Sequence, residues 1–293
     1  MKIKFLLSLL TLVCMSAVAR DTYNFNSGWL VNIGDVEAGN NEITLREGGS
    51  FPGLDDSGWR KVTLPWAHNE DEAFKVSIEQ LTDTVAWYRK HFRVPKGKDD
   101  KVFVEFEGIR QGADFYINGH WLGRHENGVM AVGWDLTPYL KKGDNVIAVR
   151  TDNDWDYKEY STGSHYQWND RNFNANYGGI PKNVYLHVSK PVYQTLPLWS
   201  GLGTTGTYIY ATDIDIPAKS AVINAETQVR NESRNTVELA CRVTVTDPDG
   251  KQIASFTGPI VSIKPGETRE LTAKAPVSNL EFWSWGYGYL YDV

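Results

Sequence analysis

The stretch Asp114-Phe115-Tyr116-Ile117-Asn118-Gly119-His120-Trp121-Leu122-Gly123 decides the fold class of this 293-residue chain. Two short runs rich in aromatic and branched residues flank the dipeptide Asn118-Gly119. Asn-Gly between two such runs is a strong signal for a two-residue β-hairpin turn, because both residues tolerate a positive φ. The sequence therefore predicts two antiparallel strands here.

The same strand pattern recurs on both sides of this hairpin, whereas helix signals are weak almost everywhere. Apolar and polar residues alternate over 101–107 and again over 237–245, the period of a half-buried strand. The second run predicts one inner face made of five side chains: Val237, Leu239, Cys241, Val243 and Val245. We therefore expect an all-β protein in which Cys241 is a core residue.

Composition and charge narrow the class of protein further. Hydrophobic residues make up 41% and charged residues 23%, the balance of a globular chain and not of a disordered one. A net charge of −6 without a basic run argues against a nucleic-acid partner. The aromatic load is unusual, with 11 Trp, 15 Tyr and 11 Phe residues. Such rings usually go into sheet cores, with some left over to stack on flat apolar ligands such as sugar rings.

The N-terminal residues 1–19 have the pattern of a cleavable signal peptide. Lys2 and Lys4 precede a short apolar run, and Ala17-Val18-Ala19 fits a cleavage site. We therefore expect a secreted or periplasmic protein that starts at Arg20, with a lipidated Cys14 as the alternative. No other stretch is apolar enough to span a membrane. Cleavage leaves Cys241 alone, which excludes an intramolecular disulfide.

A composition change near Lys190-Pro191 predicts two domains. Residues 20–190 are rich in Trp, Asn and Asp, whereas 191–293 are rich in Val, Thr, Ala and Glu. The later part contains about seven short strands, as in an immunoglobulin-like sandwich. The fold class predicted is a jelly-roll (galactose-binding-like) β-sandwich over 20–190, followed by an immunoglobulin-like β-sandwich over 191–293.

Motifs for cofactors and metals are weak. Gly201 to Gly206 fits G-x-G-x-x-G, but a strand-like segment follows it where a dinucleotide site needs a helix. Asp152 to Asp156 resembles the start of a calcium loop, yet Tyr157 stands where that loop needs Gly. We expect no cofactor and no metal, with a structural calcium ion at this acidic loop as the alternative to a turn-forming one.

The segment 167–180 is the best candidate for a binding site. It combines amide, carboxylate, guanidinium and aromatic groups in an irregular loop, which suits the hydroxyls and the C–H face of a sugar ring. The predicted carbohydrate-binding residues are Trp168, Asp170, Arg171, Asn172, Asn174 and Tyr177. The alternative is a long loop stabilised only by asparagine turns.

Six stretches along the chain carry a family resemblance. They are GWRKVTLPW at 58–66, AWYRKHFRVP at 86–95, VEFEG at 104–108 with NG at 118–119 and GRH at 123–125, DLT at 135–137 with GDNVIAVR at 143–150, GGIPKNV at 178–184, and WSWGYGYLY at 283–291. Together they resemble the non-catalytic N-terminal half of glycoside hydrolase family 2, the family of β-galactosidases, β-glucuronidases and β-mannosidases. Two positions depart from the pattern: His68 is displaced by Trp66-Ala67, and Lys182 replaces an arginine.

The resemblance implies the function of the front part of a glycosidase. The family order is a jelly-roll sugar-binding domain, an immunoglobulin-like sandwich and a (β/α)₈ barrel that carries the catalytic glutamates. The 103 residues that remain after residue 190 (293 − 190) are too few for a barrel of roughly 250 residues. Three Asn-Glu pairs, at 41–42, 69–70 and 231–232, fall in sandwich segments. No residue is therefore expected to be catalytic.

The main hypothesis is therefore that the chain is the front portion of a secreted, β-galactosidase-like glycosidase and is inactive alone. Two alternatives stay open beside it. One is a stand-alone, lectin-like carbohydrate-binding module, and the other is a subunit that pairs with a separate catalytic barrel. The hypothesis of a glycosidase portion predicts an exposed apolar surface near the C-terminal residues, which a catalytic barrel would cover. Its expected source is the aromatic set Phe282, Trp283, Trp285, Tyr287, Tyr289 and Tyr291, unless these rings fold back onto the second sandwich.

Overall fold

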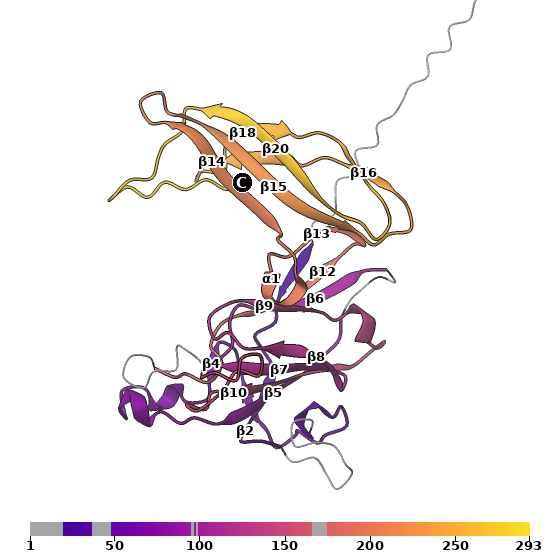
Figure 1. Ribbon diagram of the computed structural model, residues 1–293, viewed down its shortest axis with the longest axis vertical. Coiled ribbons are helices and arrows are strands. Elements are labelled where there is room, and N and C mark those ends of the chain that lie inside the picture. The colour runs from indigo at the N-terminus through magenta and orange to yellow at the C-terminus, as the bar shows by residue number, and fades with distance from the viewer. Residues whose placement is uncertain (1–19, 37–47, 95–96, 98, 166–174) are drawn as a thin grey trace, which may run out of the picture.

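The computed structural model describes residues 20–36, 48–94, 97, 99–165 and 175–293. Its regular elements are almost all antiparallel strands, arranged in two bodies, as Figure 1 shows. The first body takes the indigo to salmon part of the chain and the second the orange to yellow part. The prediction of a jelly-roll sandwich followed by an immunoglobulin-like sandwich is confirmed.

Two antiparallel sheets form the first sandwich. The four-stranded sheet has the order β1-β12-β6-β9 and the six-stranded sheet the order β3-β2-β5-β10-β7-β8. The bounds in the first sheet are β1 Asp21–Asn24, β12 Val184–Ser189, β6 Lys101–Phe106 and β9 Val132–Asp135. Those in the second are β3 Arg60–Val62, β2 Trp29–Ile33, β5 Val85–Phe92, β10 Asn145–Asp152, β7 Gly112–Ile117 and β8 His120–His125.

Smaller elements complete this sandwich. The two-residue strands β4 (Trp66–Ala67) and β11 (Gly179–Ile180) pair with each other at one edge. The described part of the chain has four 3-10 turns between strands: η1 Gly48–Ser50, η2 Glu70–Glu72, η3 Ile78–Gln80 and η4 Thr137–Tyr139. The predicted hairpin joins β7 to β8 through Asn118 and Gly119, whose φ angles of 51° and 86° fit a turn with two left-handed residues.

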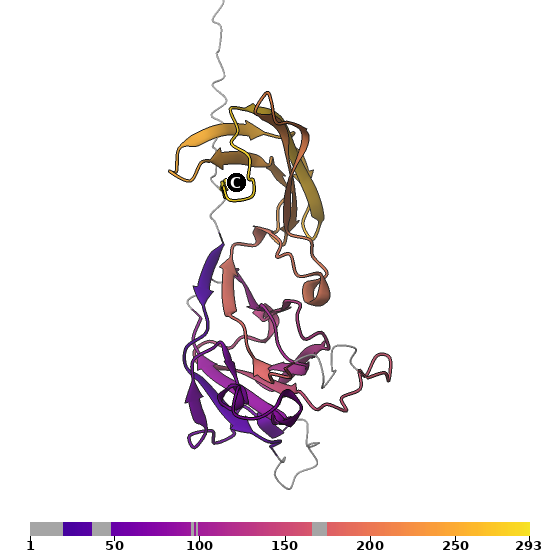
Figure 2. The same ribbon diagram turned by 90° about the vertical axis from the view of Figure 1, so that its left-hand side faces the viewer.

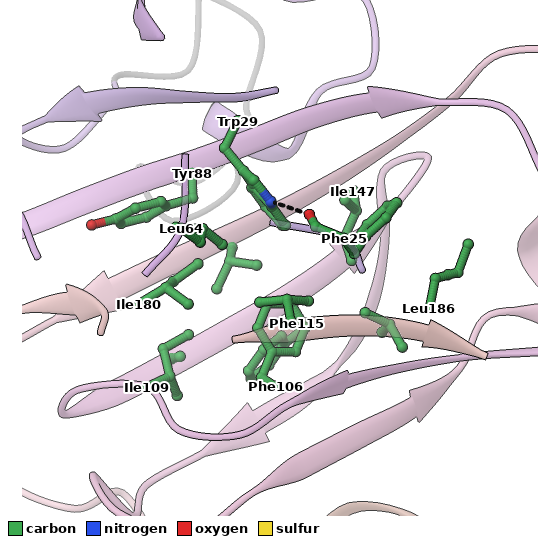
Figure 3. Close-up of a cluster of buried hydrophobic side chains, with 14 of the residues drawn as sticks. Phe25, Trp29, Leu64, Tyr88, Phe106, Ile109, Phe115, Ile147, Ile180 and Leu186 are labelled. Carbon is green, nitrogen blue, oxygen red and sulfur yellow. Dashed lines mark hydrogen bonds between the residues drawn. The ribbon is translucent and has the colours of Figure 1, made fainter. Parts of the chain in front are cut away.

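The core between the two sheets is built from aromatic and aliphatic side chains. Trp29 is completely buried, and its indole N–H donates to the carbonyl of Phe25 at 2.9 Å, the dashed line in Figure 3. Phe115 of the six-stranded sheet meets Phe106 of the four-stranded sheet with ring centroids 5.1 Å apart. Rings in this edge-to-face arrangement gain stabilisation beyond their buried area.

Strand β5 explains why the WYRK stretch carries polar side chains into a buried strand. Its residues from Ala86 to Lys90 are all buried, so each polar tip needs a partner. The partners are Asp35 Oδ1 for the Trp87 indole, the Trp66 carbonyl for the Tyr88 hydroxyl, Asp56 for the Arg89 guanidinium, and the Phe25 and Ser27 carbonyls for the Lys90 ammonium. Burial lowers the pKa of Lys90 to about 8.

The second sandwich surrounds a smaller core. Its largest sheet joins β14 (Thr207–Asp215), β15 (Ser220–Asn231) and β20 (Thr268–Ser278), with β13 (Val192–Gln194) beside the end of β15. Two antiparallel pairs complete it: β16 (Val237–Leu239) with β19 (Val261–Ile263), and the hairpin of β17 (Arg242–Thr246) with β18 (Gln252–Thr257). Cys241 is buried in this core, as predicted.

The alternating run over 237–245 is not one continuous strand. It breaks after Leu239, because β16 pairs with β19 whereas β17 pairs with β18. All five alternating side chains still belong to the same hydrophobic cluster. The predicted face is therefore correct and the predicted continuity is wrong.

A short connection packs the two sandwiches together. Leu196 and Leu198 are buried against Phe103 of β6, and the helix α1 (Trp199–Leu202) lies against β9. The backbones approach closely here: a Cβ added at Gly201 would lie 2.3 Å from the carbonyl oxygen of Gly133. Figures 1 and 2 both place this connection between the two bodies.

Lys101 adds an ionic contact at this junction. Its ammonium lies 3.2 Å from Asp135 of β9 and 2.6 Å from Glu232, which follows β15. Burial disfavours the charge of Lys101, but the two carboxylates outweigh burial and raise its pKa. Glu232 also accepts hydrogen bonds from Arg230 and from the Tyr193 hydroxyl. The contact of Lys101 thus links the first sandwich, through Asp135, to the second, through Glu232.

We predict that Lys101→Ala weakens the coupling between the sandwiches and lowers the free energy of unfolding by about 1–2 kcal/mol, because two carboxylates lose a largely buried cation. Differential scanning calorimetry should show a lower and broader transition. Arg93→Ala is the matched control, since both partners of its pair with Asp144 are exposed and lie within the first sandwich. Equal effects of the two substitutions would contradict the prediction.

Candidate functional site: a buried amide neck below a polar segment

The segment 154–175 leaves the end of β10 and returns at β11, and a pair of asparagines joins its two ends. The side chain of Asn153 donates to the carbonyl of Asn176 at 3.1 Å, and the side chain of Asn176 donates to the carbonyl of Asn153. Both residues are buried, with at most 1% of their surface exposed. The reciprocal bonds close the segment into a loop whose ends are fixed.

Two further buried amides complete this arrangement. Gln111 donates from Nε2 to Oδ1 of Asn176 at 2.9 Å, and Asn69 donates from Nδ2 to the carbonyl of Asn176 at 2.8 Å. Asn69 also accepts the backbone N–H of Gly178 at 3.1 Å. We call the four residues Asn69, Gln111, Asn153 and Asn176 the neck. Each neck bond is shielded from water, so leaving one partner unpaired is costly.

His68 packs directly beneath the neck. Its backbone N–H donates to the carbonyl of Gly178 at 3.0 Å, and a Cβ added at Gly178 would lie 2.2 Å from Cε1 of His68. Burial lowers the pKa of His68, against the raising effects of the Thr82 backbone and of Glu72. A glycine is therefore required at 178, and the imidazole is kept neutral.

The first half of the segment rests on a second polar cluster. Arg124 of β8 donates to Asp114 and, at 2.8 Å, to the Tyr157 hydroxyl, which donates in turn to Glu126 at 2.6 Å. The Arg124 guanidinium lies 3.9 Å from the ring centroid of Tyr160. Burial and the bond to Glu126 raise the pKa of Tyr157. The first half of the segment is thus held on the six-stranded sheet.

Five of the six predicted carbohydrate-binding residues lie outside the described residues: Trp168, Asp170, Arg171, Asn172 and Asn174. Tyr177 is described and half-buried. It lines an open groove of about 570 Å³ together with Ala175 and the segment 73–81. Phe74, Val76 and Ile78 expose their side chains there, with Phe74 fully exposed. The site thus presents apolar and aromatic surface beside the fixed ends of the polar segment.

The acidic residues that follow β10 form turns. Asp152 accepts the backbone N–H of Asp154 at 3.2 Å, and Asp154 accepts that of Asp156 at 2.7 Å. Asp152 also pairs with Arg150 at 3.5 Å. Among the described residues, no group of three His, Cys, Asp or Glu side chains is placed to hold a metal ion. The described helices include none that is long and apolar enough to cross a membrane.

The neck was missed by sequence reasoning. Asn69, Asn153 and Asn176 have the residue type of ordinary turn asparagines, and Gln111 lies in no motif. A weak signal existed in their positions: Asn153 comes three residues after the GDNVIAVR stretch, and Asn176 comes two residues before the GGI stretch. Their burial depends on contacts between segments up to 109 residues apart, which no local pattern encodes.

The fold and the site define an all-β, two-sandwich module whose first body is a jelly-roll of the galactose-binding type. Comparison with known families agrees: residues 65–194 match the "Glycosyl hydrolase 2 galactose-binding domain-like" model, and residues 207–293 match the "Glycosyl hydrolases family 2" model. The chain belongs to glycoside hydrolase family 2.

Individual relatives share this assignment. The chain is 35% identical to a β-glucuronidase of Formosa agariphila over 94% of its own length and 27% of that protein. It is 30% identical to the β-galactosidase BoGH2A of Bacteroides ovatus, of which it covers 29%. A solved family 2 β-glucuronidase superposes with a TM-score of 0.81 at 33% identity, and 28% of that chain is covered. The chain thus spans less than a third of the length of these relatives.

We predict that Asn176→Ala destabilises the first sandwich by about 2–3 kcal/mol, because Gln111 and the carbonyl of Asn153 each lose a buried partner. Urea denaturation followed by tryptophan fluorescence would measure the change. Asn235→Ala is the matched control, since Asn235 is exposed and only its backbone takes part in the hydrogen bonds described; its effect should stay within about 0.5 kcal/mol. A neutral Asn176→Ala would show that the neck does not stabilise the fold.

Stability should also fall when the pH drops below about 6.5. Burial lowers the pKa of both His68 and His125 in the folded protein. The unfolded chain therefore takes up protons first, and stability is lost as the pH falls from the ordinary histidine value toward the lower folded value. Urea denaturation at about pH 7.5 and about pH 5.5 tests this, since the carboxylates titrate below that range.

Substitution of the two histidines tests whether they cause this pH dependence. The double variant His68→Gln with His125→Gln should lose most of the difference between the two pH values. His120→Gln should keep it, because His120 is exposed. An unchanged difference in the double variant would show that other groups are responsible.

Proposed function

We propose that this chain is the non-catalytic N-terminal portion of a secreted family 2 β-glycosidase, and that it supports and frames a catalytic barrel. The main observation is the match to a β-glucuronidase along 94% of this chain but only 27% of that protein. A relative of that length has room for a further domain of barrel size. The substrate class that follows is a β-glucuronide or a β-galactoside.

The exposed apolar residues near the C-terminal end support this proposal. Trp283, Trp285 and Tyr287 expose 65%, 95% and 50% of their surface, and Leu290 exposes 75%. Phe282 and Tyr291 instead pack against the hydrophobic clusters of the second sandwich. The aromatic set therefore splits into an anchored part and an exposed part, and the exposed part forms a surface suited to a further domain.

The polar segment and its neck give the first sandwich a role in the same enzyme. The neck fixes both ends of the segment, so its residues can be held at a defined position at the mouth of an active site. We propose that Trp168 and Tyr177 stack on a sugar ring, and that Asp170, Arg171, Asn172 and Asn174 bond its hydroxyls. The exposed aromatic groove at Tyr177 supports this assignment.

The intact mass of the native protein tests the proposal. We expect a mass far above that of the 274-residue chain (293 − 19) that starts at Arg20, and an N-terminal residue that shows cleavage after Ala19. The longer form should hydrolyse an aryl β-glucuronide or an aryl β-galactoside, whereas residues 20–293 alone should hydrolyse neither. A native mass equal to the 274-residue chain would overturn the proposal.

A stand-alone carbohydrate-binding module is the second candidate. The observation in its favour is the galactose-binding-like match over 65–194, together with the groove beside Tyr177. Glycan-array binding by residues 20–293 would support it if Trp168→Ala and Asp170→Ala abolish the signal and Trp285→Ala, in the second sandwich, retains it.

A further inference from the structure

The turn between η2 and η3 in the first sandwich holds a phenylalanine ring in solvent. Phe74 is fully exposed, and its φ of 64° lies in the left-handed region that residues with a Cβ rarely adopt. A glycine would take the same backbone conformation without this strain. A large apolar side chain kept in a strained and exposed position therefore indicates a role other than folding.

Hydrogen bonds fix the backbone around Phe74. The N–H of Lys75 donates to the carbonyl of Glu72 at 2.9 Å. The Glu72 carboxylate accepts the backbone N–H of Thr82 at 2.7 Å and the Thr82 hydroxyl at 2.5 Å. The carbonyl of Thr82 in turn accepts a bond from the side chain of Asn69, a neck residue, at 2.8 Å. The turn that carries the ring is thus tied to the same buried amides that fix the polar segment.

Phe74 lies on one wall of the groove beside Tyr177. Val76 and Ile78 extend this wall with further exposed apolar side chains, and the buried Leu81 also lines the groove. Tyr177 lines it from the other segment. The volume of about 570 Å³ is within the range of small-molecule sites, roughly 300–1,000 Å³. Both walls belong to one sandwich, so the groove is already formed before a ligand binds, as is usual for such sites.

The groove has few polar groups to offer a ligand. Among the described residues that line it, Glu79 is the only charged one. A bond from its own backbone and a bond from the Ser77 hydroxyl lower the pKa of Glu79, so this carboxylate already has partners. A second sugar ring would place its hydroxyls against apolar side chains that cannot bond them. An apolar ring suits the groove better, because it can stack on Phe74.

We propose that this groove binds the aglycone, the non-sugar part of a β-glycoside substrate, and that Phe74 makes the enzyme select apolar, ring-shaped aglycones. The proposal rests on the proposed function, which places a sugar ring beside Trp168 and Tyr177. Tyr177 then borders both ligand parts, with the polar segment on one side and the groove on the other. An aryl β-glycoside joins a polar ring to an apolar ring through one oxygen atom, which matches a polar segment that adjoins an apolar groove.

The test uses the longer native protein and two substrates that carry the same sugar, a 2-naphthyl and a methyl β-glycoside. The sugar is glucuronic acid or galactose, whichever that protein hydrolyses. In Phe74→Ala, the ratio of kcat/KM for the naphthyl substrate to kcat/KM for the methyl substrate should fall about fivefold, because the aryl aglycone loses its stacking partner. Comparing this ratio between variant and parent removes the difference in leaving group.

Phe51→Ala is the matched control. Phe51 is also an exposed phenylalanine of the first sandwich, but it does not line the groove. Its replacement should leave the ratio unchanged. Phe74→Tyr keeps an aromatic ring at the groove and should keep most of the selectivity.

Phe74→Gly separates binding from folding. It removes the ring together with the strain of the left-handed backbone. Calorimetry of residues 20–293 should therefore show a melting temperature no lower than that of the parent chain. In the longer protein the same variant should lose as much selectivity as Phe74→Ala. A ring required for folding would instead lower the melting temperature.

Two results would overturn the proposal. One is a substrate ratio that is equal in the parent and in Phe74→Ala. The other is protection of Phe74 from hydroxyl-radical oxidation in the ligand-free longer protein, because further polypeptide or a second copy would then cover the groove. We expect rapid oxidation of Phe74 in that protein.

The native mass separates this proposal from the proposed function. A longer native protein that hydrolyses aryl β-glycosides but shows no effect of Phe74→Ala overturns the aglycone site alone. A native protein of 274 residues overturns the proposed function and the aglycone site with it.

Discussion

The pairing of buried polar groups is the constraint on which this structure depends, and Arg89 shows it most clearly. Its side chain is 0% exposed in the middle of β5, where an unpaired guanidinium would be very costly. Asp56 bonds it at 2.7 Å, and the carbonyls of Gly49 and Phe51 accept further bonds. Burial alone would raise the pKa of Asp56, but its bonds to Arg89 and His91 lower it. The segment from Gly48 to Asp56 is thereby held across the sheet.

The same constraint makes the neck specific in a way that apolar packing could not. An apolar residue at 176 could fill the volume, yet it would leave the carbonyl of Asn153 and the amide of Gln111 without their partner. The bonds also have fixed directions, so they set where the chain leaves β10 and where it enters β11. Rigid supports of this kind are what a functional loop requires to keep side chains at a defined place.

The local patterns predicted the strands well because their causes are local. The Asn118-Gly119 hairpin and the alternating face of Val243 and Val245 depend on turn chemistry and period alone. The break after Leu239 was not predictable, because it reflects a change of partner strand from β19 to β18. The neck was hidden for a related reason, since an asparagine has the same sequence signature in an exposed turn and in a buried network. The carbohydrate contacts assigned to Trp168 and its neighbours stay a prediction.

The second sandwich is attached to the first on one side and exposes large apolar side chains on another, and this arrangement has a physical meaning. Trp285 of the second sandwich is almost fully exposed, and Leu290 exposes 75% of its surface. Lys101 and the buried Leu198 meanwhile fix this second body to the first. A body that is attached through buried contacts on one side and exposes aromatic rings on another has the kind of surface that the proposed further domain would cover.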